Sequence, residues 1–253
     1  MAKPNGVVLF EGPSRIDGED IVVIATGLKG KSGNPKTGHM VQTWILRADV
    51  SPMDALRSGA DKSICGGCIH RPKQALGTTF KGRSCYVNPQ GMSSVYRAYA
   101  RGSYPKVSPT EAGKLAAGLM VRLGSYGDPA AVPPEVWTAL LAESFGHTGY
   151  THQWKAKRFR DVLDVCQVSA DTPQDAEAAH AAGLGSFRVL GPTDEPLPFE
   201  VRCPASEEAG RVAVCAECLM CSGAGGKNVV INAHGIGAAQ YKPRKGRALP
   251  VLN

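Results

Sequence analysis

The sequence predicts an α/β protein, built as a partial (β/α) barrel or an open parallel sheet with cysteine-rich metal-binding loops. Segments typical of strands and helices alternate along residues 111–200, and short loops join them, which favours parallel strands with right-handed crossovers. The alternation gives about four to six βα units, fewer than the eight of a closed barrel. Seven of the eight cysteines lie in two groups on either side of this region, which predicts metal-binding loops beside the sheet.

Residues 1–110 form the first of three expected regions and are rich in Gly, Pro and Ser. The apolar runs at 21–25 and 40–46 predict two strands, and the turn-rich segment between them predicts a loop. The first cysteine group follows the second of these strands. We therefore expect this region to contribute N-terminal strands and the first metal loop.

Residues 111–200 are expected to form the βα repeat core, and residues 201–253 a cysteine cluster, a last strand at 228–232 and a basic tail. Proline falls in the first turn of predicted helices, where its missing N–H costs no hydrogen bond, and Gly183 is placed to end one of them. The predicted elements are a helix from 109, a strand at 119–123, a helix at 133–142, a strand at 148–151, a short helix at 157–163, a strand at 165–169, a helix at 173–182 and a strand at 187–190.

The second cysteine group has the more specific spacing. Cys215, Cys218 and Cys221 recur at three-residue intervals, and Cys203 lies upstream as a fourth thiol. A compact C-x2-C-x2-C run is typical of ferredoxin-like iron–sulfur ligation, whereas a zinc ribbon normally brings two separated C-x2-C pairs. Three of these cysteines together with His234 would also make a tetrahedral zinc site, so zinc is the alternative.

The first group consists of Cys65, Cys68 and Cys85, with His70 close by in the sequence. Three thiolates and an open fourth position would make a reactive site. If His70 fills that position, the site is closed and structural. Both alternatives predict a metal site in this loop.

The cysteine content also indicates a cellular compartment. A disulfide framework is mostly found in small secreted domains, whereas this chain has 253 residues and begins without the features of a signal peptide. No apolar run approaches the ~20 residues of a membrane span. We therefore expect a soluble cytoplasmic protein with free thiols.

Charge favours an anionic partner. The net charge is +7 and the isoelectric point is near 9.0. Basic residues gather at 155–160 and in the tail at 242–247. Nucleic acid or a nucleotide is the expected partner, and an ordinary solvated basic face is the alternative.

Candidate site residues lie at the predicted carboxyl ends of strands, where ligands bind in such folds. Asp128 is a candidate catalytic base or, alternatively, the N-cap of the next helix. Tyr150, His152 and Trp154 alternate along a strand end, so they would share one face. There they would offer stacking surface and a proton donor, or serve as ordinary sheet packing.

Two serines and one cysteine occupy comparable positions. Ser125 and Ser169 lie at strand ends and are candidate residues for cofactor binding. Cys166 falls inside a predicted strand, where a free cysteine is usually a small core residue.

The order of these motifs resembles a family of phage-encoded gene products, over a stretch from Asn34 to Cys221. The motifs concerned are those at 34–38, 43–46, 121–128 and 150–154, together with the two cysteine groups. More distantly, the chain resembles the radical SAM superfamily, with its partial barrel and its three early cysteines, the last followed by an aromatic residue like Tyr86. In that superfamily, extra cysteines near the end bind auxiliary clusters.

The radical SAM resemblance implies a phage-type iron–sulfur enzyme in the host cytoplasm, acting on a nucleotide or nucleobase. The first cysteine group would hold a [4Fe–4S] cluster that binds SAM, and the second group would hold another cluster. The residues placed at the substrate are Asp128, Tyr150, His152 and Trp154.

Two alternatives remain open at this stage. The tRNA-guanine transglycosylase group is a second resemblance, and it implies structural zinc held by the C-x2-C-x2-C run and His234, with Asp128 as nucleophile. Its Asp-Ser-Gly-Gly signature is absent from this chain. The third hypothesis is a non-catalytic nucleic-acid-binding protein, in which both metal sites only stabilise loops.

Overall fold

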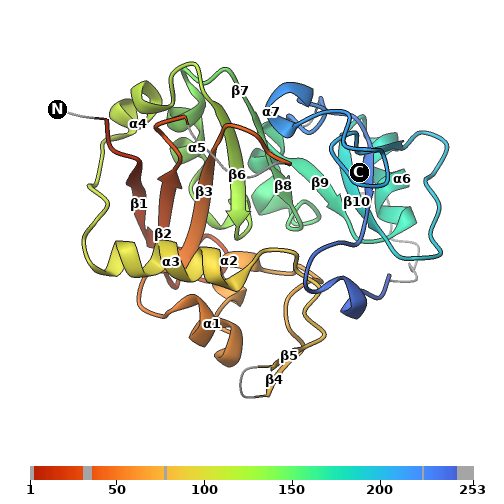
Figure 1. The fold of residues 1–253 in the computed structure, drawn as a ribbon, viewed down its shortest axis with the longest axis horizontal. Helices are drawn as coiled ribbons and strands as arrows, with labels where there is room; N and C mark the ends of the chain where they lie inside the picture. Colours follow the sequence, from red (N-terminus) through yellow and green to blue (C-terminus); the bar gives the residue numbers. More distant parts are fainter. Residues whose placement is uncertain (1–2, 31–35, 77–78, 224, 244–253) are drawn as a thin grey trace.

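The computed structural model describes residues 3–30, 36–76, 79–223 and 225–243. It shows two five-stranded sheets side by side, with helices around them (Figure 1). Asn34 and Pro35, which begin the resemblance motif at 34–38, and residues 244–247 of the basic tail lie outside the described residues. No helix of the described part is both long enough and apolar enough to cross a membrane.

The first sheet combines an antiparallel and a parallel half. β1, β2 and β3 are antiparallel neighbours, whereas β3, β6 and β7 run parallel. In sheet order the strands are β1 (Gly6–Pro13), β2 (Asp20–Thr26), β3 (Met40–Arg47), β6 (Met120–Tyr126) and β7 (Gly146–Thr148). The antiparallel half differs from the partial barrel or open parallel sheet expected from the sequence: a six-residue connection, 14–19, joins β1 to β2, and the described residues between β2 and β3 contain no crossover helix.

All strands of the second sheet are parallel to their neighbours. In sheet order they are β8 (Tyr150–Thr151), β9 (Gln167–Ala170), β10 (Ser186–Leu190), β12 (Val229–Asn232) and β11 (Val201–Arg202). The parallel strands predicted from the βα alternation are therefore confirmed, in a mixed α/β fold.

Gly149 joins the two sheets where the sequence predicts one uninterrupted strand. Its N–H donates to the carbonyl of Cys221, and its own carbonyl accepts from the N–H of Gln167. A Cβ at this position would lie 2.8 Å from the Sγ of Cys166, so only glycine fits here. At this break the chain passes from β7, an edge strand of the first sheet, to β8, an edge strand of the second sheet.

Helices connect the strands, and those that start at Pro109 and Pro173 begin as the sequence predicts. Ser51, Ser108 and Thr172 each precede a proline, and their side chains accept hydrogen bonds from the third residue of α1, α4 and α6. The α-helices of the described residues are α1 (Pro52–Ser58), α2 (Lys62–Cys65), α3 (Pro89–Ala100), α4 (Pro109–Ala116), α5 (Pro134–Leu141), α6 (Pro173–Ala181) and α7 (Cys215–Cys218). The 3-10 turns are η1 (Pro129–Ala131), η2 (Lys157–Asp164) and η3 (Ala238–Gln240). A separate hairpin consists of β4 (Gln74–Leu76) and β5 (Thr79–Lys81).

The main core lies between the first sheet and its helices. It includes Ile21, Ile45 and Trp137, all of them buried, and the indole N–H of Trp137 donates to the carbonyl of Pro129. Cys166 belongs to this core and is fully buried. The three regions expected from the sequence share sheets. β3 of region 1–110 pairs with β6 of region 111–200, and β10 of region 111–200 pairs with β12 of region 201–253.

Candidate metal centre

A cavity of ≈190 Å³ opens at the carboxyl ends of the parallel strands. The ends of β6, β8 and β9 contribute Ser125, Tyr150 and Ser169 to its wall. Seven of the eight cysteines line the same cavity: Cys65, Cys68, Cys85, Cys203, Cys215, Cys218 and Cys221. The two cysteine groups, more than a hundred residues apart in the sequence, therefore meet at one place.

The first cysteine group comes from the loop after α2 and from the segment after β5. Cys65 ends α2, and the N–H of Cys68 donates to its carbonyl at 3.1 Å. Gly66 follows at φ +53°, where a Cβ would collide with the side chain of Gln153. The N–H of Cys85 donates to the carbonyl of His70, which ties the second segment to the first.

Burial governs the acidity of these thiols. It raises the pKa of Cys65 well above its ordinary value, and the neighbouring Cys68 raises it further. Burial likewise raises the pKa of Cys85. Buried thiols of this kind lose their protons when a metal binds, because a coordinating cation stabilises the thiolate.

The second group surrounds α7. Cys215 and Cys218 bracket this one-turn helix, Leu219 then turns the chain at φ +52°, and Cys221 follows. Cys203 approaches from the end of β11, where its N–H donates to the carbonyl of Val230 at 2.8 Å. Burial raises the pKa of Cys221 to about 12, with the hydroxyl of Tyr150 as a hydrogen-bond partner that opposes the shift.

The spread of the sulfur atoms bears on the choice of metal. Tetrahedral zinc holds each sulfur at ≈2.3 Å, so its ligand sulfurs lie about 4 Å from one another. Within the described part of the chain, where all eight cysteines are free, no three cysteine sulfurs come within 4.8 Å of one another. As they stand, the described cysteines therefore do not have the spacing of three ligands around one tetrahedral zinc ion.

The two histidines considered as extra ligands line the same cavity, but each contacts other groups. His234 has its Nε2 3.3 Å from the Nζ of Lys36 and its Nδ1 3.0 Å from the carbonyl oxygen of Asn232, and its ring stacks on Tyr86. His70 has its Nδ1 2.8 Å from the Oγ of Ser84. Among the described residues, neither histidine joins two cysteines in a compact ligand set.

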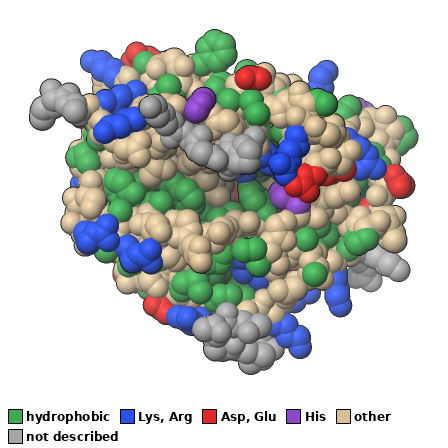
Figure 2. Space-filling view, in the orientation of Figure 1, with side chains coloured by type: hydrophobic (Ala, Val, Ile, Leu, Met, Phe, Trp, Pro, Cys, Tyr) green, Lys and Arg blue, Asp and Glu red, His purple; other side chains and the backbone are tan. Residues whose placement is uncertain are grey.

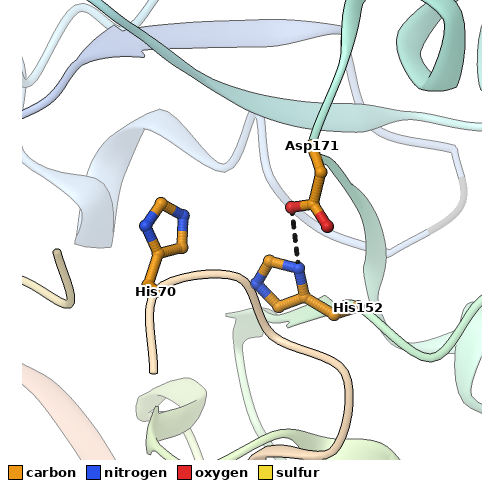
Figure 3. A group of neighbouring side chains, drawn as sticks. All are labelled: His70, His152 and Asp171. Atoms are coloured by element: carbon orange, nitrogen blue, oxygen red, sulfur yellow. Dashed lines mark ion pairs between the residues drawn. The ribbon is translucent and has the colours of Figure 1, made fainter. Parts of the chain in front are cut away.

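One compact ligand set does occur in the cavity wall, and it contains no cysteine. Ligand atoms of His70, His152 and Asp171 all lie within 4.8 Å of one another (Figure 3). His152 and Asp171 follow the adjacent parallel strands β8 and β9, while His70 comes from the first cysteine loop. The Nδ1 of His152 lies 3.0 Å from the Oδ1 of Asp171.

Asp128 positions His152. Its Oδ2 accepts hydrogen bonds from the His152 N–H at 2.8 Å and from the Nε2 of Gln153 at 3.0 Å. Its Oδ1 accepts from the N–H of Ala130, so Asp128 is also the N-cap of η1. The N-cap role predicted as the alternative for Asp128 is therefore confirmed, and its carboxylate is fully engaged with the chain.

Two opposing influences act on the pKa of His152. Burial lowers it, whereas the charges of Cys68 and Asp171 and hydrogen bonds to both raise it more, so that the pKa lies well above its ordinary value. The imidazole thus lies between a thiol of the first cysteine group and a carboxylate.

The aromatic residues at the end of β8 lie in two different environments. Tyr150 and His152 line the cavity, and the ring of Tyr150 lies 4.6 Å from that of Phe187. Trp154 is not among the lining residues and packs in a small second core with Val168. The strand ends at Thr151, so the two-residue alternation expected from the sequence stops before Trp154.

Sequence reasoning missed one cation of the cavity, Arg122. It lies within β6, partly exposed to the cavity, donates to the hydroxyl of Tyr86 and lies over that ring. Lys36 lines the cavity as well, and burial lowers the pKa of its ammonium group. A lone arginine inside an apolar strand was the available signal for Arg122, since such a charge is rarely buried without a role.

Some basic side chains of the segment 155–160 make contacts within the protein. Lys155 forms an ion pair with Asp175 at 2.8 Å, and Arg158 lies 4.6 Å from the centre of the Phe159 ring and donates to the carbonyl of Ile16. On the face seen in Figure 2, Lys and Arg form several separate groups. The described residues of this face therefore do not form the continuous basic stripe typical of a nucleic-acid groove.

The cavity thus combines thiols from two loops, a histidine–carboxylate cluster and two cations. Such a set can bind soft metals through sulfur, harder ions through nitrogen and oxygen, and anions through Lys36 and Arg122. Comparisons with protein-family models, with curated proteins and with solved structures gave no match to this chain. Its function is therefore inferred from these residues.

Proposed function

We propose that this protein is a two-cluster iron–sulfur enzyme of the radical SAM type that acts on a nucleotide or nucleobase. Cys65, Cys68 and Cys85 would hold a [4Fe–4S] cluster with one coordination position left for SAM. The second cluster would be held by Cys203, Cys215, Cys218 and Cys221. The observation that carries the proposal is that both cysteine groups line one cavity at the carboxyl ends of parallel strands.

Three cysteines, with no fourth cysteine in this group, suit a cluster that must bind a small molecule. His70 is the nearest other ligand type in this loop, and its ring contacts Ser84, stacks on Tyr241 and faces His152. It is therefore directed to another group. The third cysteine comes from a separate segment, unlike the contiguous C-x3-C-x2-C run of radical SAM enzymes, yet it faces the same cavity.

The second group supplies four cysteines, which matches the four-thiolate ligation of a closed cubane cluster. His234 is held by Lys36 and Asn232, which argues against a transglycosylase-type zinc site made of three cysteines and one histidine. Lys36 and Arg122 lie close enough to Cys215 to lower its pKa, although burial has the larger, opposing effect. Such cations would stabilise the negative charge of a thiolate-bound cluster.

The strand order supports a partial barrel. From β3 the parallel strands continue through β6 and β7 and then, in the second sheet, through β8, β9, β10 and β12, and all of them except β3 contribute residues to the cavity at their carboxyl ends. This resembles the partial barrel of the radical SAM superfamily, in which the cofactor lies at the same end of the strands. β1 and β2 would extend that barrel as an antiparallel edge.

The remaining lining residues suit an anionic substrate with an aromatic ring. Arg122 and Lys36 provide positive charge for a phosphate, and Arg122 makes no ion pair with a carboxylate among the described residues. Tyr150 and Phe187 form an aromatic wall against which a base could stack. A [4Fe–4S] cluster, when bound, would supply single electrons for cleavage of SAM.

Protein purified and reconstituted without oxygen would test the proposal. We expect reductive cleavage of SAM to 5′-deoxyadenosine by the wild type, loss of cleavage in Cys68→Ala, and retention in Cys166→Ala, whose thiol lies in the core away from the cavity. Cys218→Ala should lose the second cluster but keep SAM binding. Equal cleavage by wild type and Cys68→Ala, or none by a wild type with two intact clusters, would contradict the assignment.

A further inference from the structure

The cluster of His70, His152 and Asp171 has the donor set of a metal site in its own right. Two imidazole nitrogens and one carboxylate oxygen lie within 4.8 Å of one another, each of the three side chains only partly exposed (Figure 3). First-row divalent ions bind such ligands at about 2.0–2.2 Å, so three donors around one ion lie about 3–4 Å apart. Small side-chain rotations would bring the three donors to these distances.

The ring nitrogens that face away from the cluster are held in place. The Nδ1 of His70 lies 2.8 Å from the Oγ of Ser84, and a hydrogen bond from Nδ1–H would put the lone pair of that ring on Nε2. The Nδ1 of His152 faces Asp171 within the cluster, and the His152 ring is also hydrogen-bonded to the thiol of Cys68, outside the cluster. Metal-binding histidines are typically fixed through their second nitrogen in this way.

The backbone also fixes the two strand-end ligands. His152 is anchored by Asp128, which accepts its N–H at 2.8 Å. The N–H of Asp171 donates to the carboxylate of Asp175 at 3.2 Å. Because β8 and β9 are hydrogen-bonded neighbours, the two residues that follow them emerge side by side.

We propose that His70, His152 and Asp171 bind one divalent first-row transition-metal ion in the cavity. Two histidines and one carboxylate leave coordination positions open, and this donor set is typical of mononuclear iron or manganese sites. The open positions face the cavity that Lys36 and Arg122 line, so an oxygen atom of an anionic ligand could complete the coordination. None of the seven cavity cysteines is a ligand here, although His152 is hydrogen-bonded to Cys68, one of the thiols assigned to the first cluster.

Mn²⁺ is a suitable probe because it prefers nitrogen and oxygen ligands to thiolates. Titration of the anaerobically purified protein, followed by the EPR signal of free Mn²⁺, should show one bound ion per chain. Asp171→Asn and His70→Gln should each weaken binding by at least about tenfold. The matched controls Asp164→Asn and His180→Gln change an exposed carboxylate and an exposed histidine and should bind as the wild type does.

A second measurement does not depend on variants. Pulsed EPR of the bound Mn²⁺ should detect the nitrogen couplings of two imidazoles. For the titrations above, far-UV circular dichroism would verify that each variant is folded. No bound Mn²⁺ in the wild type, no imidazole coupling, or equal binding by Asp171→Asn would overturn the proposal. In that case His152 and Asp171 form an ion pair without a metal.

Discussion

The carboxylate of Asp128 holds the backbone of His152, because its Oδ2 accepts the His152 N–H at 2.8 Å while its Oδ1 caps η1. Asp128 is 4 % exposed, so both contacts are shielded from water. A residue that sequence reasoning offers as a base therefore acts as a positioning residue for the histidine beside the first cysteine group.

Replacement of Asp128 should destabilise the fold. Asp128→Ala removes an N-cap and two further acceptor contacts, which should lower the free energy of unfolding by about 3 kcal/mol. Asp128→Asn keeps an acceptor oxygen and should cost less. Urea unfolding would measure both, with Asp164→Asn, a change at an exposed carboxylate, as the control. Wild-type stability in Asp128→Ala would contradict the positioning role.

A buried ion pair fixes the segment that presents Cys203. Arg188 of β10 is 4 % exposed and Glu200 is fully buried, and the guanidinium donates to both carboxylate oxygens. Glu200→Gln leaves the arginine buried without its counter-charge and should cost about 3–5 kcal/mol. Glu195→Gln, at a carboxylate that is 83 % exposed, should cost little. Equal stability of the two variants in urea would show that the pair does not hold this segment.

His147 should make stability depend on pH. Burial lowers the pKa of His147, and the contact of its Nε2 with the carbonyl of Val165 only partly opposes this. Since the folded-state pKa lies below the unfolded value of about 6.5, His147 stabilises the fold above that pH, and this contribution is lost as the pH falls through the folded-state pKa.

Melting temperatures between about pH 7.5 and pH 5.5 would test this dependence. The wild type should lose stability toward the acid end, and His147→Gln should lose less of it over the same range. His180→Gln, at an exposed histidine, should follow the wild type. A steeper loss in His147→Gln than in the wild type would show that the sign is wrong.

Loss of one ligand of the second cluster should be selective. Cys203→Ser removes the cysteine that reaches α7 from β11, so iron content should fall by about half, while the first cluster keeps its spectrum. The same substitution at Cys166, a core residue, should leave the iron content unchanged. Complete loss of iron in Cys203→Ser would mean that the two groups do not bind separate clusters.

Much of the parallel half of the fold follows from the sequence. Capping residues before prolines, as at Ser108 and Thr172, mark helix starts through local hydrogen bonds, and apolar runs such as 120–126 mark buried strands. β1 was missed although its residues 7–10 form an apolar run of strand-forming residues, and Val7 and Val8 belong to the main core. This run was a usable signal for a strand.

The site was predictable in its ligand types but not in its layout. Spacing alone groups Cys215, Cys218 and Cys221, because those residues are near neighbours in the chain. The meeting of the two cysteine groups, and of His70 with Asp171, depends on loops that converge only when the sheets form. For Trp154 the sequence pattern was misleading. Its two-residue spacing from His152 predicts that both share one face of a strand, but β8 ends at Thr151 and Trp154 packs in the small second core.

Metal analysis would decide whether the two cysteine groups hold iron–sulfur clusters. Iron, acid-labile sulfide and zinc would be measured per chain on protein purified without oxygen, alongside its visible spectrum. We expect about eight irons and eight sulfides per chain, in a brown protein. A colourless protein with one or two zinc ions and no sulfide would refute the two-cluster assignment and would favour metal sites that only stabilise loops.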